Sequence, residues 1–116
     1  MIGDDALDAA LSLIADKASR LDVCAAKPMT YAAAMASIGY TGTFNVSKPS
    51  ACPDGRKTLV TGIIDGTVTR KGSPTHWALT GQGKLLACGE IRNAPELTPG
   101  ASFRLPDITI ELMSGD

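Results

Sequence analysis

The sequence predicts a mainly β fold, a β-sandwich or small barrel of about seven short strands preceded by an N-terminal amphipathic α-helix. Near the N-terminus, apolar residues recur at helical spacing. After Gly39 the chain becomes rich in Thr, Val and Gly, and turn residues separate short alternating apolar runs. A chain of 116 residues accommodates one domain with one core. We therefore expect a single domain over residues 1–116, with a helical part (1–38) packing on a β-rich part (39–116).

The first expected element is an amphipathic helix between Asp4 and Arg20. Apolar residues repeat there at spacings of three and four, and polar residues lie outside that stripe. The stripe comprises Leu7, Ala10, Leu11, Ile14 and Ala18, and the polar set comprises Asp8, Ser12 and Asp16. Asp4 or Asp5 is placed to cap the helix start, and the late basic residues suit the helix dipole.

A short strand and a second helix are expected next. Residues 21–25 alternate in the manner of a strand, which Lys27-Pro28 ends. Thr30 is placed to cap an Ala-rich helix over Tyr31–Ser37, which Gly39 would end.

The remaining chain contains seven short runs typical of a sandwich or barrel. They are Thr41–Lys48, Arg56–Ile64, Thr67–Lys71, Thr75–Thr80, Lys84–Cys88, Ser102–Leu105 and Ile108–Leu112. Asp65-Gly66 is a candidate two-residue hairpin turn, and Gly81-Gln82-Gly83 predicts another hairpin. The Pro- and Gly-rich segment 49–55 is expected to be an exposed loop.

Composition limits the function classes. Eleven Lys and Arg against 12 Asp and Glu give a net charge of −1, so we expect no nucleic-acid partner. No apolar run approaches the roughly 18 residues of a spanning helix, so we expect no membrane association. The N-terminal residues lack the basic and apolar regions of a secretory signal, so synthesis in the cytoplasm is expected.

No motif in the sequence indicates an enzyme. The single histidine, His76, is the one base available to activate a cysteine, and its place in an alternating strand favours an ordinary sheet-face role. Neither a phosphate-binding loop nor a metal-ligand spacing is present. We therefore expect no catalytic residue, cofactor or metal.

Two basic pairs are the candidate polar anchors for a partner. Arg56-Lys57 and Arg70-Lys71 would lie side by side if Asp65-Gly66 closed a hairpin between them. That positive face has two interpretations, a solvated strand edge protected from aggregation or a docking patch for an acidic partner surface.

Several segments together resemble a family of small tailed-bacteriophage proteins encoded among virion structural genes. They are Asp5–Asp16, Arg20–Tyr31, Gly55–Lys57, Ile64–Val68, Thr75–Leu79 and Ile108–Ile110. The resemblance covers nearly the whole chain, and its motifs carry no catalytic or binding residue.

The resemblance implies a virion protein that binds an assembled lattice. A capsid decoration, cement or linker protein is the first expectation, and a neck, collar or tail component is the alternative. A small intracellular binding module or enzyme is the third. The expected partners are the major capsid protein or neighbouring virion proteins, with this chain present in many copies or as a homo-oligomer.

The three cysteines form no close pair in the sequence. Cys24 and Cys88 lie in expected strands and are predicted to be buried, whereas Cys52 lies in the expected exposed loop. In the virion that the resemblance implies, lysis moves the particle into an oxidising medium. We therefore predict an intermolecular disulfide through Cys52 in mature particles.

Overall fold

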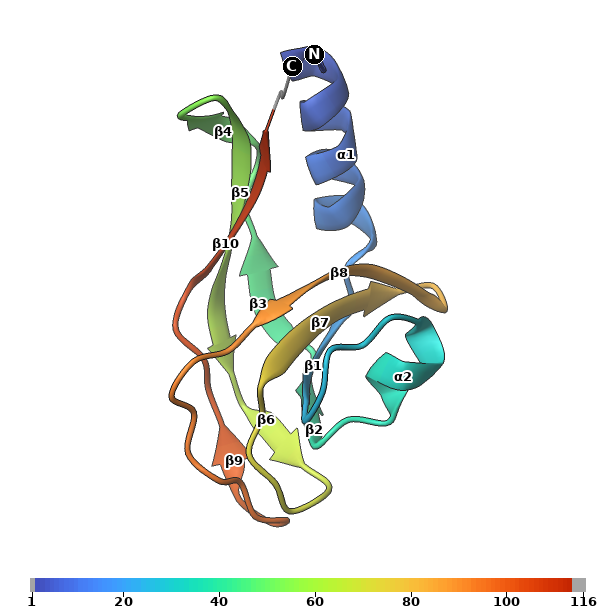
Figure 1. The fold of residues 1–116 in the computed structure, drawn as a ribbon, viewed down its shortest axis with the longest axis vertical. Coiled ribbons are helices and arrows are strands. Elements are labelled where there is room, and N and C mark those ends of the chain that lie inside the picture. The colour runs from blue at the N-terminus through green and yellow to red at the C-terminus, as the bar shows by residue number, and fades with distance from the viewer. Residues whose placement is uncertain (1, 114–116) are drawn as a thin grey trace.

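The computed structural model describes residues 2–113, and the chain is mainly β with an N-terminal helix, as predicted (Figure 1). The elements follow in the order α1 (Asp4–Lys17), β1 (Arg20–Cys24), α2 (Tyr31–Met35), β2 (Gly39–Thr41), β3 (Thr43–Val46), β4 (Ser50–Cys52), β5 (Gly55–Ile64), β6 (Gly66–Val68), β7 (His76–Gly81), β8 (Lys84–Glu90), β9 (Ser102–Phe103) and β10 (Ile108–Met113). All seven expected runs overlap a strand, and the strand expected at residues 21–25 is present as β1.

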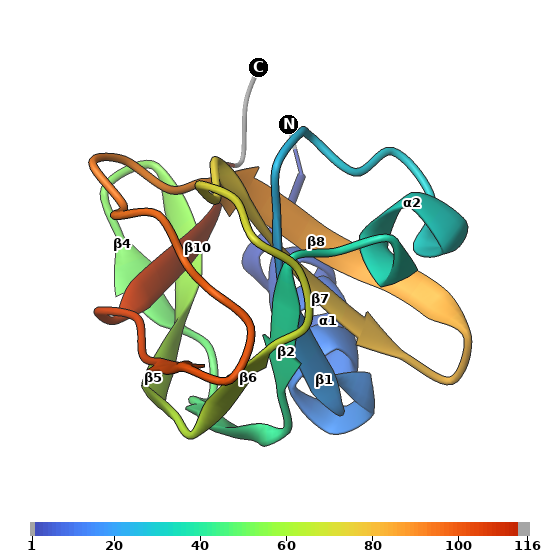
Figure 2. The ribbon, with the colours of Figure 1, turned by 90° about the horizontal axis from the view of Figure 1, so that it is seen from below.

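The strands form two antiparallel sheets that share a common interior. One sheet has the order β8-β7-β1-β2-β6-β9, and the other has the order β10-β5-β3, with β4 paired to the start of β5. Three chain segments pass from one sheet to the other, namely β2 into β3, β5 into β6, and β9 into β10. The two sheets therefore curl into an incomplete barrel, as the view along the long axis shows (Figure 2).

The predicted Asp65-Gly66 hairpin is wrong. Asp65 does have the positive φ (57°) of a turn residue, but β5 and β6 belong to different sheets and do not pair. The chain turns a barrel corner there, and the hydroxyl of Thr41 stabilises that corner from the neighbouring strand. Thr41 Oγ1 donates to the Ile64 carbonyl at 2.7 Å and accepts from the Thr43 N–H at 3.0 Å.

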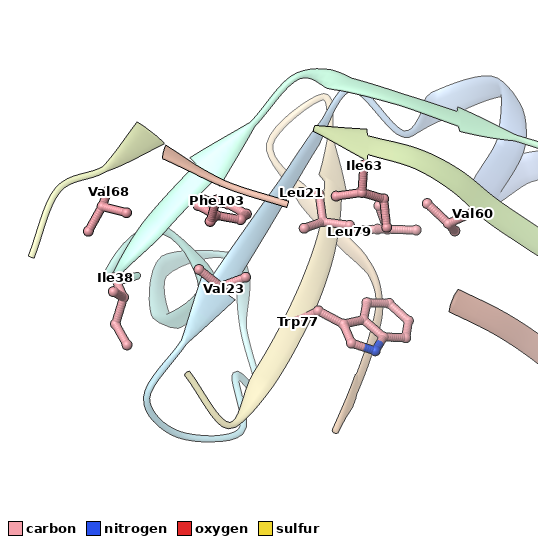
Figure 3. Packing of buried hydrophobic residues seen from close by; sticks show 9 residues of the cluster. All are labelled: Leu21, Val23, Ile38, Val60, Ile63, Val68, Trp77, Leu79 and Phe103. Atoms are coloured by element: carbon pink, nitrogen blue, oxygen red, sulfur yellow. The ribbon is translucent and has the colours of Figure 1, made fainter. Parts of the chain in front are cut away.

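The core lies between the two sheets (Figure 3). Its central residues are Leu21, Val23, Ile38, Val60, Ile63, Val68, Trp77, Leu79 and Phe103. They come from both sheets and from both ends of the chain, and burial of each large aliphatic or aromatic side chain contributes about 1.5–3 kcal/mol. The strand β1 supplies two of them, so the first 38 residues contribute a central strand as well as the helices.

Helix α1 covers β5 with the predicted apolar face. Leu7 and Leu11 are buried, and Ile14 packs against the core. Ala10 is exposed, so the predicted stripe was wrong at that position. Asp8, expected outside the stripe, is half-buried because it forms an ion pair with β5.

The ends of α1 also differ from the prediction. Gly3 occupies the N-cap, so neither Asp4 nor Asp5 does. The helix stops at Lys17, before Arg20, because the Ser19 N–H donates to the Thr80 carbonyl and leads the chain into the sheet. A Cβ atom on Gly81 would lie 1.8 Å from the Lys17 carbonyl oxygen, so a glycine is needed at this contact.

Helix α2 begins where predicted, with Thr30 Oγ1 accepting from the Ala33 N–H at 3.1 Å. It ends at Met35, before the predicted Ser37, and Gly39 begins a strand. The reason is that the Ile38 N–H donates to the Val23 carbonyl, which draws the chain into β2.

Of the two remaining turns, one was predicted correctly. Gln82 and Gly83 both have positive φ, 53° and 74°, and close the predicted hairpin between β7 and β8. The segment 49–55 is no irregular loop, because Ser50–Cys52 pairs with β5 through a turn at Pro53 and Asp54. Asp54 has the positive φ (60°) that this tight turn requires.

Candidate functional site

The four predicted basic anchors do not form one surface. Arg56 and Lys57 are neighbours near the start of β5, so their side chains point to opposite faces of the sheet. Arg70 and Lys71 follow β6, beyond the barrel corner at Asp65. The predicted positive face is therefore wrong, because it required β5 and β6 to pair as a hairpin.

Two of these residues have ion-pair partners within the chain. Arg56 Nε and Nη2 donate to the two carboxylate oxygens of Asp8 at 2.7 and 3.3 Å, and this hydrogen bonding raises the pKa of Arg56. Lys71 Nζ lies 3.8 Å from a carboxylate oxygen of Glu96 at an exposed position. Arg56 thus holds α1 onto β5.

The three cysteines are free thiols. Cys24 is buried as predicted, in a small apolar cluster under α2, and burial raises its pKa to about 11. Cys88 was also predicted to be buried, but it is only half-buried beside that cluster. Cys52 is half-buried in β4, so it is less exposed than the predicted loop would have made it. The intermolecular disulfide through Cys52 stays a prediction.

The structure places His76 directly opposite Cys24 on adjacent strands. His76 Nδ1 lies 2.8 Å from the hydroxyl of its neighbour Thr75, and Cys24 is 3% exposed. Because burial raises its pKa, the Cys24 thiol stays protonated at neutral pH and lacks the thiolate that a nucleophile needs.

A buried carboxylate that the sequence analysis did not single out lies in the middle of the six-stranded sheet. Asp22 is 0% exposed. Arg20 Nε and Nη2 each donate to one of its carboxylate oxygens at 2.9 Å, and Ser37 Oγ donates at 2.7 Å. The Arg-x-Asp spacing was a usable signal, because residues two apart on a strand share a face.

The same arginine organises an exposed aromatic surface. Its guanidinium lies 4.2 Å from the centre of the Tyr40 ring, and Tyr31 lies nearby. The hydrogen bond to Asp22 raises the pKa of Arg20. We call Arg20, Tyr31 and Tyr40 the Arg20 patch, and we include Met29 because it is 72% exposed and precedes Tyr31 by two residues in the chain.

A groove of about 760 Å³ runs between β8 and β10, the outermost strands of the two sheets. Within residues 2–113, no strand pairs with the outer edge of either. Trp77, Ile108 and Ile110 contribute its apolar lining, and it continues past the loops that follow β8 and β9. We call this space the seam groove, because a strand pairing there would close the barrel.

The charged residues of the seam groove have both signs. They are Glu90, Arg92, Arg104, Asp107 and Glu111. Arg92 and Glu90 lie 3.8 Å apart at exposed positions. No group of three or more His, Cys, Asp or Glu residues in the described part of the chain is placed to hold a metal ion.

Comparison of the chain with protein-family models, curated protein sequences and solved structures finds no match. Among the described residues, no helix is long and apolar enough to cross a membrane.

Proposed function

We propose that this protein is a structural component of a tailed-bacteriophage virion, a capsid decoration or linker protein that binds the assembled capsid lattice. The proposal starts from the segments that resemble small phage virion proteins. The observation that supports a binding role most directly is the Arg20 patch. In this proposal the protein acts through its surface, catalyses no reaction, and is made in the cytoplasm of a bacterial host.

The Arg20 patch has the composition of a protein interface. Tyr, Met and Arg are enriched in the centres of such interfaces relative to the rest of a protein surface. Tyr31 and Tyr40 are each more than one-third exposed, and Met29 is mostly exposed. A partner would bury this area without displacing any part of the core.

Arg20, at the centre of the patch, is also held in place before any partner arrives. Arg20 is fixed by two hydrogen bonds to Asp22 and by the Tyr40 ring, so its side chain has little freedom to lose. Binding surfaces that are ordered in advance avoid an entropic cost of about 0.5–1.5 kcal/mol for each long side chain. On a lattice, neighbouring bound copies raise one another's effective concentration further.

The experiment is the analysis of purified particles. We expect each purified particle to contain tens to hundreds of copies of this chain. Its density should lie on the capsid surface, in contact with the major capsid protein or a neighbouring virion protein. Density at the neck, collar or tail would favour the alternative virion role. Absence from purified particles would contradict both virion roles and leave a small intracellular binding module or enzyme.

A matched pair of variants tests the Arg20 patch itself. M29S/Y31S removes two exposed side chains of the patch, and we expect it to lower particle occupancy at least about ten-fold with little change in melting temperature. Leu13→Ser removes an exposed apolar side chain from α1 and is the control. Equal occupancy of the two variants would remove the patch from the proposal.

A further inference from the structure

We infer that the seam groove binds an extended segment of another polypeptide, which adds to the free edge of β10 as an antiparallel strand. This inference deepens the proposed function, on which it rests only for the identity of the partner as a virion protein. The segment that fits carries apolar side chains at alternate positions facing Trp77, and Lys or Arg opposite Glu111.

The backbone groups of β10 face the groove at alternate residues. The Ser47 N–H donates to the Leu59 carbonyl at 2.9 Å, so Leu59 directs its backbone groups toward β3. Hydrogen bonding alternates along an antiparallel strand, so the residues on either side of Leu59 bond to β10. Their partners are Ile108 and Ile110, which leaves the N–H and C=O of Thr109 and Glu111 directed into the seam groove.

The opposite wall shows the same arrangement. The Ile91 N–H donates to the Thr75 carbonyl at 2.7 Å, next to the His76–Glu90 pair, so Ile91 directs its N–H toward the strand that contains β7. By alternation, the backbone groups of Cys88 and Glu90 point away from β7 and toward the groove. Backbone donors and acceptors on both walls are what an inserted β-strand satisfies.

Edge β10 is unprotected in a way that the other edges are not. Natural proteins protect sheet edges with proline, bulges, lysine or very short strands. In the described structure, β9 has two residues, β3 and β8 each border a register shift, and β4 lies between two prolines. By contrast, β10 pairs with β5 in unbroken register over six residues and contains no proline, glycine or lysine.

The apolar side chains along β10 are also only partly buried. Ile108, Ile110 and Leu112 are half-buried and alternate with exposed residues. Ile108 and Ile110 lie opposite Val60 and Thr58, which are fully buried, so this face of β10 points inward. An added strand would place apolar side chains beside them.

Trp77 supplies a polar contact within the apolar lining. It is 6% exposed and borders the groove, and no described residue accepts a hydrogen bond from its indole N–H. A Cβ atom on Gly89 would lie 2.8 Å from that nitrogen, so the glycine leaves room for the indole. A carbonyl of the inserted segment would accept from it.

The size of the groove selects a single extended segment over a second copy of this chain. A volume of about 760 Å³ lies within the range of pockets that enclose small ligands, so the groove admits a short segment and not a folded domain. The β10 strand of a second copy would bring its attached β5, and β8 stands on the other side of the groove. Glu111 lies opposite Lys57 of β5 in the register but forms no close ion pair in the described structure, and cross-strand pairing of opposite charges favours Lys or Arg opposite it in an added strand.

The test selects peptides with the intact protein from a displayed library of random ten-residue sequences. Binding is measured by the fluorescence of Trp77, the only tryptophan in the chain, which borders the groove. We expect selected peptides with alternating apolar residues and a basic residue. Methylation of their backbone nitrogens at alternate positions should lower affinity at least about ten-fold, because it removes ladder hydrogen bonds.

Two proline variants form the matched pair on the protein side. Thr109→Pro removes an N–H that faces the groove, and we expect a near-normal melting temperature with at least about ten-fold weaker peptide binding. Ile110→Pro removes an N–H that bonds to β5 and should destabilise the fold. If Thr109→Pro also unfolds the protein, the methylated peptides give the same test.

Three results would overturn the inference. The first is a selection that yields no peptide sensitive to backbone methylation. The second is a set of peptides that bind wild type and a folded Thr109→Pro variant equally. The third is a concentration-dependent dimer that Thr109→Pro abolishes, which would make a second copy the occupant. None of these experiments uses virus particles, so they can fail while the particle analysis succeeds.

Discussion

Asp22 is a buried residue that holds a surface residue, Arg20, in position. It accepts three hydrogen bonds from Arg20 and Ser37 while fully buried, and the arginine it holds supports the Tyr40 ring outside the sheet. A buried carboxylate is costly unless its oxygens are satisfied. The network therefore couples the stability of the sheet to the shape of the Arg20 patch.

Substitution of Asp22 should be destabilising well beyond a surface change. For Asp22→Asn we expect a loss of about 2 kcal/mol in the free energy of unfolding, because charge-assisted hydrogen bonds to Arg20 and Ser37 are replaced by weaker ones. The measurement is urea denaturation at neutral pH. Asp16→Asn, at an exposed position of α1, is the control and should change stability by less than about 0.5 kcal/mol.

The cysteines should differ in reactivity by position. Burial raises the pKa of Cys24 to about 11 from its ordinary value near 9, which lowers its thiolate fraction about 100-fold at pH 8. A thiol reagent applied to the folded protein should therefore modify half-buried Cys52 and Cys88 first and Cys24 last. Peptide mass mapping of partly labelled protein measures the order. Early labelling of Cys24 would contradict the packing under α2.

The same shift gives a pH dependence with a defined sign. The folded-state pKa of Cys24 lies above its unfolded value, so the protonated thiol stabilises the fold fully at pH values below about 9. That contribution is lost as the pH rises through about 11. The melting temperature should fall over this interval, and Cys24→Ala should reduce the fall.

At the scale of elements, α1 should act as part of the core. Leu11→Ala removes a fully buried side chain, so we expect a loss of about 2–5 kcal/mol, and Leu11→Asp should prevent folding. Leu13→Ala, on the same helix but 53% exposed, is the matched control and should change stability by less than about 0.5 kcal/mol. Thermal denaturation of both variants decides, and equal melting temperatures would contradict the packing of α1 on β5.

Elements with strong local signals could be predicted from the sequence. The stripe through Leu7 and Leu11, the Thr30 cap and the Gln82-Gly83 turn depend on residues within a few positions of one another. The Asp65 corner could not be predicted fully, because Asp-Gly indicates a turn without stating whether the flanking strands pair. The outcome there depends on Thr41, more than 20 residues earlier.

The candidate sites were harder to predict because they are assembled from distant segments. The salt bridge between Asp8 and Arg56 joins residues 48 positions apart. Arg56, which was expected to be a polar anchor for a partner, instead binds Asp8 of the same chain. The seam groove requires the edges of β8 and β10 to face one another, which follows from the whole strand order. Only the Arg-x-Asp spacing at Arg20 and Asp22 was visible locally.

At the scale of the whole molecule, the described chain is elongated, with extents of 44 × 25 × 23 Å. Helix α1 and the β4–β5 hairpin lie together toward one end of the long axis, whereas α2 packs beside β7 and β8 nearer the middle (Figure 1). The hairpin carries Cys52, so this thiol lies well away from the cluster that contains Cys24 and Cys88. Any disulfide bond formed by Cys52 would therefore join two separate chains.

The position of Cys52 favours a disulfide between neighbouring copies in an assembled particle. If copies are arranged on a shell as proposed, Cys52 thiols near a symmetry axis can approach to the roughly 5.5 Å between Cα atoms that a disulfide requires. Oxidation would follow lysis, because the host cytoplasm keeps thiols reduced. We expect a band at twice the chain mass on non-reducing electrophoresis of purified particles, lost with reductant and absent in Cys52→Ser. Cys88→Ser is the control and should retain it. A monomer band alone, with free thiols blocked before denaturation, would contradict the prediction and leave Cys52 as a half-buried free thiol of the hairpin.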